Sequence, residues 1–116
     1  MPDKRPENVV LVGFMGSGKT AIGKLASRLL GFQFLDTDQL IVDRAGRQIT
    51  DIFATDGEPA FRKLETNVLE SLSHINRCII STGGGAVLLE SNREILRSLG
   101  FVVLLNASEE TLYERI

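Results

Sequence analysis

The chain has 116 residues, of which 43% are hydrophobic and 24% are charged, with 11 glycines and 3 prolines. This composition is typical of one globular domain with a single core, and it excludes the collagen-like, disordered and disulfide-rich classes. The formal net charge of −2 provides no general attraction to nucleic acid or to an anionic membrane. Any phosphate binding therefore has to be local.

The chain contains one cysteine, Cys78, and one histidine, His74, which exclude an internal disulfide and a zinc cage. The apolar run at 9–12 is too short for a signal peptide and is soon followed by glycine and lysine. We therefore predict a cytoplasmic protein in which Cys78 is a small buried side chain and His74 lies at the surface.

After a polar N-terminal tail, short apolar runs alternate with segments of helical spacing. The runs are bounded by Gly, Asp or Asn and predict strands at 9–12, 32–35, 78–81 and 101–105. Helices are predicted from the phosphate loop to Gly31, from Asp38 to Gly46, from Thr50 to Gly57, from about Pro59 to Leu72, and over 92–99 and 108–116. This alternation predicts a parallel sheet covered on both faces, with ligands bound beyond the carboxyl ends of its strands.

Two of the predicted helices carry an apolar stripe, which is typical of a helix that packs on a core. The first helix carries its stripe on Ile22, Leu25, Ala26 and Leu29, and the helix near Pro59 carries one on Phe61, Leu64, Val68 and Leu72.

Residues 13–20, with the sequence GFMGSGKT, fit the pattern G-x-x-x-x-G-K-[ST] between a predicted strand and a predicted helix. In such a loop the backbone N–H groups surround phosphate oxygens, and the helix N-terminus adds a partial positive charge. Lys19 is expected to bind the β and γ phosphates, and Thr20 is expected to bind Mg²⁺ through its hydroxyl.

A second interpretation of this loop is open. Gly16, Gly18 and Ala21 fit the looser dinucleotide-binding fingerprint, and Asp36 follows at about the spacing of a ribose-binding carboxylate. The Lys-Thr pair after Gly18 argues against it, because a dinucleotide loop has no terminal phosphate or metal for these groups to bind.

Two carboxylates, Asp36 and Asp38, follow the second predicted strand. One can lie near the metal through a water molecule, because Mg²⁺ gives up its waters reluctantly. The other can orient or deprotonate an acceptor hydroxyl for in-line attack on the γ phosphate. Alternatively, Asp38 caps the helix that follows, and the two roles are compatible because a cap uses one carboxylate oxygen.

Two further features are candidates for the substrate side. Arg62 can form surface ion pairs with Glu58 and Glu65, or it can clamp an anionic substrate with its planar guanidinium. Gly83, Gly84 and Gly85 follow the third predicted strand, either as a flexible loop or as a place where a ligand approaches the backbone closely.

In order and spacing, four motifs of this chain resemble those of shikimate kinase. They are the loop at 13–20, LDTD at 35–38, the residues Ile52, Phe53, Gly57, Glu58, Phe61, Arg62 and Glu65, and STGGG at 81–85. The resemblance covers the chain from Val9 onward. It implies a three-layer α/β/α P-loop NTPase fold with a central parallel sheet of strand order 2-3-1-4, and one P-loop kinase domain over 1–116.

The resemblance implies transfer of the γ-phosphoryl group of ATP to the 3-hydroxyl of shikimate, in chorismate and aromatic amino acid biosynthesis. It implies Mg²⁺ as the cofactor and a cytoplasmic monomer that binds ATP and shikimate but no nucleic acid or membrane. Positioning and electrostatics supply most of the catalysis in such a reaction.

The resemblance also implies roles for individual residues. The ATP-binding residues are Gly16, Ser17, Gly18, Lys19, Thr20, Ala21 and Arg115, with Arg115 on the adenine, and the metal is held by Thr20 and, through water, by Asp36. The substrate-binding residues are Asp38, Arg62, Gly83, Gly84, Gly85, Phe53 and Phe61, with Glu65 steadying Arg62. Lys19 and Asp38 are the catalytic residues, and Asp38 acts either as the general base or by orienting the hydroxyl.

The family pattern continues beyond Arg115 with a mobile lid that carries an arginine, a further substrate arginine, and a last strand and helix. We therefore expect the fifth strand and the lid beyond the chain end, with apolar surface left exposed. Since an arginine of this kind is worth roughly 10³ to 10⁵ in rate, we expect these 116 residues alone to be a poor kinase. Two alternatives stay open: a lidless module that binds nucleotide or substrate without transfer, and a P-loop kinase for another small hydroxylated acid.

Overall fold

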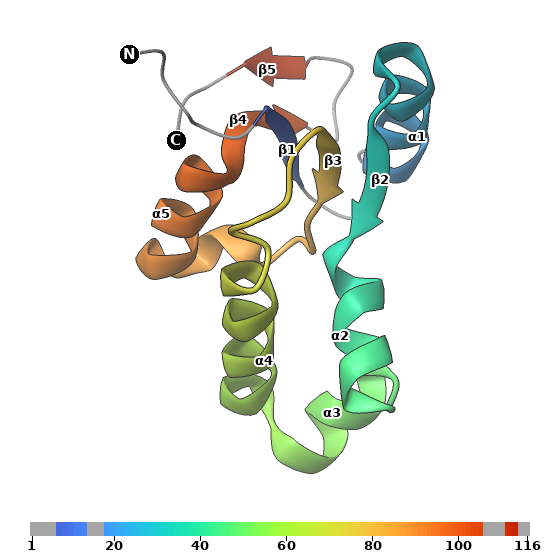
Figure 1. Cartoon of the computed structure of the whole chain (residues 1–116). Coiled ribbons are helices and arrows are strands. Elements are labelled where there is room, and N and C mark those ends of the chain that lie inside the picture. The colour runs from blue at the N-terminus through green and yellow to red at the C-terminus, as the bar shows by residue number, and fades with distance from the viewer. Residues whose placement is uncertain (1–6, 14–17, 106–110, 114–116) are drawn as a thin grey trace.

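The computed structural model describes residues 7–13 and 18–105 and the backbone of 111–113 (Figure 1). The strands are β1 (Asn8–Gly13), β2 (Gln33–Asp36), β3 (Cys78–Ser81), β4 (Gly100–Leu105) and β5 (Thr111–Tyr113). The helices are α1 (Lys19–Leu30), α2 (Thr37–Ala45), α3 (Ile49–Asp56), α4 (Glu58–Glu70), the 3₁₀ helix η1 (Ala86–Leu88) and α5 (Glu90–Leu99).

The strands form one sheet in the order β2-β3-β1-β4-β5. The first four strands are mutually parallel, which confirms the predicted parallel sheet and the 2-3-1-4 order. Alternate residues of β1 point to opposite faces. Val10 and Val12 pack with Leu69 of α4 and Leu96 of α5, whereas Leu11 packs on the other face, against which Ala26 of α1 lies. The helices therefore cover both faces, as the predicted three-layer architecture requires.

The prediction of a helix over 108–116 is wrong at its centre. Residues Thr111–Tyr113 form β5, which pairs antiparallel with β4, with Leu112 opposite Leu104. The sheet thus has an antiparallel fifth strand inside the chain, which the sequence analysis missed, while the last strand of the family pattern, expected after the lid, stays a prediction. The physical reason is the free edge of β4, whose unpaired N–H and C=O groups are a template for any extended segment that reaches them. Residues 108–110 and 114–116 lie outside the described residues.

The apolar stripe predicted on α1 is only partly buried. Leu25 and Leu29 are 49% and 76% exposed, and the residue of α1 that is fully buried is Gly23. A Cβ at Gly23 would lie 2.5 Å from Cε1 of Phe34 and 3.2 Å from Cδ1 of Leu11. The side of the helix that carries Gly23 therefore faces the sheet, and Leu25, two positions further along, lies on roughly the opposite side of the helix. The stripe predicted near Pro59 does pack on the core: Phe61 and Val68 of α4 lie in one core cluster, and Leu72, which follows the helix end at Glu70, lies in another.

Helix boundaries follow the predicted signals with small differences. Gly31 and Gly46 end α1 and α2 in the left-handed conformation, at φ values of 70° and 67°. Pro59 lies in the first turn of α4. Gln48 stands at the N-cap of α3, so the prediction that Thr50 caps this helix is wrong: Thr50 lies in its first turn.

Asn8 joins three parts of the chain at the amino end of the sheet. Its Nδ2 donates to the carbonyl oxygens of Ile75 at 3.2 Å and Leu99 at 2.8 Å, and its Oδ1 accepts from the backbone N–H of Cys78 at 2.9 Å. The side chain is buried, so each of these bonds satisfies a backbone group that water does not reach. Asn8 thereby aligns β1 with β3 and with the end of α5.

Among the described residues, no helix combines the length and the apolar character that a membrane crossing demands.

Candidate active site

A cleft of about 500 Å³ lies at the carboxyl ends of β2 and β3 and at the N-terminus of α1. Its lining comprises Gly18, Lys19, Thr20, Ala21, Asp36, Asp38, Phe53, Phe61, Arg62, Glu65, Ser81, Thr82, Gly83, Gly84 and Gly85. The structure therefore brings together in one cavity the described residues of the predicted nucleotide, metal and substrate groups. Gly16, Ser17 and Arg115, predicted to bind ATP, lie outside the described residues.

Sequence reasoning assigned no role to Ser81 and Thr82, which also line this cleft. Both are buried, and the backbone N–H and the hydroxyl of Thr82 each donate to the carbonyl oxygen of Leu11 at 3.0 Å. The signal was available, because both residues directly precede the glycine run at the carboxyl end of a strand. These bonds fix the start of the glycine run against β1.

Lys19, the lysine of the phosphate loop, is the first residue of α1 and lines the cleft. Gly18 precedes it with φ 85°, a backbone conformation that glycine adopts without strain. The Nζ of Lys19 donates to the carbonyl oxygen of Gly13 at 2.5 Å. Burial lowers the pKa of Lys19, while the charges of Asp38 and Asp36 act in the opposite direction. The ammonium thus stands between the end of β1 and two carboxylates.

Asp36, not Asp38, caps α2. Asp36 has extended backbone angles, with φ −111° and ψ 116°, and its Oδ1 accepts from the backbone N–H of Asp38 at 2.9 Å. The alternative in which Asp38 merely caps the helix is therefore wrong: Asp38 lies in the first turn, and its carboxylate is free of that task. The physical reason is that β2 ends at Asp36, and an N-cap needs an extended residue.

The carboxylate of Asp38 faces the glycine run. Its Oδ1 is buried and has no hydrogen-bond partner among the described residues. A Cβ built on Gly83 would lie 2.6 Å from that oxygen, so only glycine leaves room for it. Burial raises the pKa of Asp38, and the charge of Asp36 adds to the rise, whereas Lys19 and Arg62 oppose it. A buried carboxylate oxygen with a raised pKa is suited to accept a proton from a bound hydroxyl.

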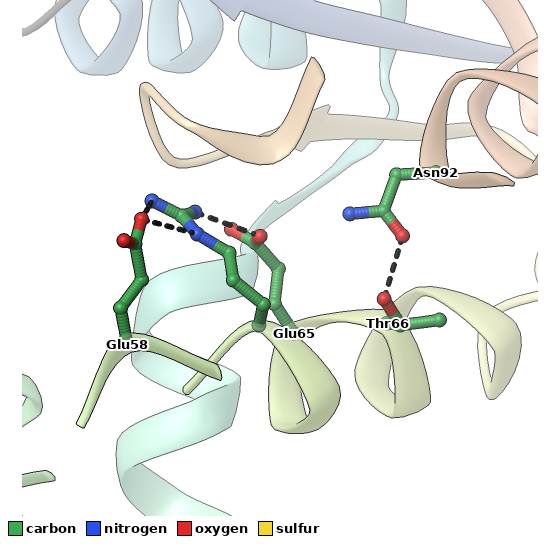
Figure 2. A network of polar contacts seen from close by, with 5 residues as sticks. Glu58, Glu65, Thr66 and Asn92 are labelled. Carbon is green, nitrogen blue, oxygen red and sulfur yellow. Dashed lines mark hydrogen bonds and ion pairs between the residues drawn. The ribbon is translucent and has the colours of Figure 1, made fainter. Parts of the chain in front are cut away.

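Arg62 is held between two glutamates of its own helix, and Figure 2 shows its contacts with Glu58 and Glu65 as dashed lines. Its Nη1 donates to Oε1 of Glu65 at 3.0 Å, and its Nη2 lies 3.2 Å from Oε2 of Glu58. The Glu65 side chain is 1% exposed, whereas that of Glu58 is 59% exposed. The prediction that Arg62 forms surface ion pairs is therefore wrong for its pair with Glu65. The side of α4 that carries this pair faces the protein interior.

Two aromatic rings and the glycine run also lie around the Arg62 side chain. The rings of Phe53 and Phe61 are 4.8 Å apart, and the Arg62 guanidinium lies 5.2 Å from the centre of the Phe61 ring. Gly85 also lies close to the guanidinium, because a Cβ there would be 2.7 Å from Cζ of Arg62. The guanidinium is thus confined between a ring and a backbone segment.

The cleft also contains oxygen donors of the kind that Mg²⁺ prefers. Thr20 supplies a hydroxyl, and Asp36 has a second carboxylate oxygen besides the one that caps α2. No group of three His, Cys, Asp or Glu side chains able to hold a metal occurs among the described residues. This donor set fits an ion that keeps several waters and binds chiefly to nucleotide phosphates, and it does not fit a metal held in a cage of protein ligands.

The family model described as shikimate kinase matches residues 15–116 of this chain. The shikimate kinase of Symbiobacterium thermophilum is 53% identical over 108 residues, which cover 93% of this chain and 62% of that protein. The shikimate kinase of Geobacter metallireducens is 50% identical over 109 residues, which cover 94% of this chain and 61% of that protein. The chain thus spans about 60% of the length of the curated relatives it matches.

Solved structures agree with these matches. The shikimate kinase from Acinetobacter baumannii in complex with shikimate superposes with a TM-score of 0.83 at 44% identity, covering 86% of this chain and 56% of that chain. The shikimate kinase from Aquifex aeolicus superposes with a TM-score of 0.78 at 42% identity, covering 84% and 58%. The APS kinase of Mycobacterium tuberculosis, at a TM-score of 0.55 and 17% identity, shares the fold alone.

Proposed function

Since this chain belongs to the shikimate kinase family, we propose that its gene product transfers the γ-phosphoryl group of ATP to the 3-hydroxyl of shikimate. The observation that carries the proposal is the cleft, which combines Lys19 of a phosphate loop with Asp38 and Arg62. The relative from Acinetobacter baumannii was solved with shikimate bound. The lysine and threonine of the loop and the family match favour this proposal over the dinucleotide interpretation.

At the nucleotide end, Lys19 binds the β and γ phosphates, and backbone N–H groups of Gly18, Thr20 and Ala21 point to the phosphate oxygens from the N-terminus of α1. The proposal extends to Gly16 and Ser17 of the same loop and to Arg115 as the contact for adenine. Lys19 supports it most directly. Its Nζ donates a hydrogen bond to the carbonyl oxygen of Gly13, and a phosphate oxygen can take the place of that acceptor.

At the acceptor end, Arg62 binds the carboxylate of shikimate through its planar guanidinium. Phe53 and Phe61 contact the ring of the substrate, and the backbone of Gly83, Gly84 and Gly85 approaches it from the other side. The arrangement that supports this is the confinement of the Arg62 guanidinium, which is 18% exposed, between Phe61 and Gly85.

In the reaction, Asp38 accepts the proton of the 3-hydroxyl or orients it, and the hydroxyl oxygen forms a bond to the γ phosphorus. The bond between that phosphorus and the bridging oxygen of ADP breaks, and ADP carries away the electron pair. Lys19 stabilises the negative charge that develops on the phosphate oxygens. When bound, Mg²⁺, held by Thr20 and through water by Asp36, neutralises part of the phosphate charge.

We place this reaction in chorismate and aromatic amino acid biosynthesis, which follows from the acceptor. We also place it in the cytoplasm, since the one cysteine of the chain is free and buried. The proposal takes residues 1–116 as one P-loop kinase domain, whose lining residues form the cleft, and it takes the protein to act as a monomer.

A coupled assay of ADP release by the complete gene product tests the proposal, with shikimate, gluconate and a nucleoside monophosphate as acceptors. Of the three acceptors, we expect only shikimate to be turned over, and we expect this turnover to depend on Mg²⁺. Turnover with gluconate or the nucleotide instead would favour a P-loop kinase for another acceptor. If ATP and shikimate bind in calorimetry but no ADP forms, the protein is a binding module and the proposed transfer is wrong.

A further inference from the structure

A buried amide of α5 lies beside the helix that carries the arginine clamp. Asn92 is 0% exposed, and its Oδ1 accepts a hydrogen bond from Oγ1 of Thr66 at 2.7 Å. Its Nδ2 is buried and has no partner among the described residues. Thr66 follows Glu65 directly in α4, so this bond ties the Asn92 amide of α5 to the helix that carries the Arg62–Glu65 pair.

The free atom of Asn92 has a counterpart on Glu65. Oε1 of Glu65 accepts from Arg62, but Oε2 is buried and, within the described part of the chain, also lacks a partner. Figure 2 shows the amide nitrogen of Asn92 pointing toward the side on which Glu65 lies. One of these atoms is a donor and the other an acceptor, so the same small group can satisfy both.

Leaving both atoms unsatisfied is unfavourable, because each buried polar group without a partner costs roughly 1 to 3 kcal/mol. A single water molecule accepts one hydrogen bond and donates another, and buried waters in proteins typically link polar groups of this kind. In the structure Thr66 donates to Oδ1 of Asn92, which leaves the N–H group of Asn92 for the Glu65 side.

We propose that Asn92 is a positioning residue, whose Nδ2–H group holds Oε2 of Glu65 through one buried water and thereby fixes the Arg62 guanidinium at the wall of the cleft. This inference rests on the proposed function for its effect on shikimate, but the contact itself does not. The path from α5 to the cleft runs from Asn92 through the water to Glu65 and then to Arg62, and Thr66 of α4 holds the other end of the amide.

Burial and the charges around Glu65 affect its protonation, and so do the hydrogen bonds that its carboxylate accepts. Burial raises the pKa of Glu65, the charge of Asp38 from α2 adds to the rise, and Arg62 opposes it through its hydrogen bond and its charge. A donor on the second oxygen stabilises the carboxylate form. When Glu65 is protonated, its attraction for the guanidinium is lost and Arg62 is free to leave its position.

Two variants remove the contact in different ways. Asn92→Leu has similar volume but no donor, and Thr66→Val removes the hydroxyl that orients the amide, while Thr66→Ser keeps a hydroxyl. Leu96→Val is the matched control, because Leu96 is equally buried on the same helix and belongs to the apolar core. Each variant is made in the complete gene product, and its thermal unfolding is recorded first.

The first readout is the pKa of the Glu65 carboxyl, followed by ¹³C NMR, which requires no substrate. We expect a rise of about one unit in Asn92→Leu, a smaller rise in Thr66→Val, and none in Thr66→Ser or Leu96→Val. An unchanged Glu65 pKa in folded Asn92→Leu and Thr66→Val would overturn the inference, whatever the protein phosphorylates. If Asn92→Leu does not fold, Thr66→Val against Thr66→Ser decides the question.

The second readout is the Kd of shikimate against the Kd of MgATP over a range of pH. We expect Asn92→Leu to weaken shikimate binding about tenfold, with MgATP unchanged and the loss growing as the pH falls. Equal affinities for shikimate at equal folded fractions would show a purely structural role and contradict the inference. A wild-type protein that binds no shikimate contradicts the proposed function instead, and the Glu65 titration then decides the inference on its own.

Discussion

Gly85 and Arg62 share a contact that no side chain at position 85 can preserve: a Cβ there would lie 2.7 Å from the guanidinium carbon. The two residues come from segments well separated in the sequence, the glycine run after β3 and the helix α4. Gly85 has φ −97°, which any residue can adopt, so the requirement for glycine here is steric and comes from the arginine.

The substitution Gly85→Ala should therefore displace the flexible guanidinium and leave the backbone in place. We expect KM for shikimate to rise about tenfold or more, with KM for ATP and the unfolding temperature nearly unchanged. Steady-state kinetics with each substrate varied in turn measures this. Leu88→Ala, an exposed position shortly after it, is the control, and equal effects of the two substitutions would contradict the prediction.

The clamp itself is tested by Arg62→Lys and Arg62→Ala. Lysine keeps the charge but loses the planar pair of donors, so we expect shikimate to bind about tenfold more weakly with lysine and about a hundredfold more weakly with alanine. Calorimetry with shikimate checks this, with Lys63→Ala as an exposed control on the same helix. Full affinity in Arg62→Lys would show that charge alone binds the substrate.

Lys19→Met removes the ammonium while keeping most of the side-chain length. We expect the affinity for MgATP to fall about ten- to a hundredfold, because charge-assisted hydrogen bonds to phosphate are lost, and the affinity for shikimate to stay unchanged. Fluorescence titration with a nucleotide analogue measures the first, and Lys24→Met, exposed on α1, is the control. An effect on shikimate as large as that on ATP would contradict the separation of the two ends of the cleft.

Asp38→Asn tests the group next to the acceptor hydroxyl. We expect kcat to fall about 10² to 10⁴-fold while the Kd of MgATP changes little, because the amide can orient a hydroxyl but cannot take its proton. In the wild-type protein, kcat should fall on the acid side at a pH above the ordinary Asp pKa of 3.8, since the pKa of Asp38 is raised. Asp43→Asn, on the exposed side of α2, serves as the control.

Asp38→Asn should also change the stability of the fold, and the raised pKa of Asp38 gives the direction of the change. The pKa of Asp38 is higher in the folded than in the unfolded chain, so ionising it costs the folded state free energy as the pH rises through that window. Asp38→Asn should thus unfold at a higher temperature than the wild type at pH 7, with the difference vanishing below about pH 4. Calorimetry at the two pH values checks this, and a variant that is less stable at pH 7 would refute it.

Asn8→Ala should destabilise the fold without touching the cleft. It leaves the N–H group of Cys78 and the carbonyl oxygens of Ile75 and Leu99 without their bonds in a buried place. We expect a loss of about 2 to 4 kcal/mol, which lowers the unfolding temperature by about 10 °C or more. Thermal unfolding measures it against Asn67→Ala, an exposed helix position; comparable shifts in the two variants would show that the bonds of Asn8 are unimportant.

Residue types at short spacing determined much of this protein. The phosphate loop ending in Lys19 and Thr20, the pair Asp36 and Asp38, and the glycine run at 83–85 are local patterns, and the alternation of apolar runs predicts the parallel sheet around them. Such features follow from the sequence because backbone geometry over a few residues dictates which groups share a face or a turn.

The tertiary structure alone decided which of these groups meet. The burial of Glu65, the contact of Gly85 with Arg62, and the orientation of the Asn92 amide toward Glu65 each depend on how α4 packs against neighbouring segments. The exposure of the α1 leucines and the pairing of β5 with β4 likewise depend on packing distances and free strand edges, to which local periodicity is blind. The amino-acid sequence thus specified the chemical groups of the cleft, and packing set their distances and the solvent around them.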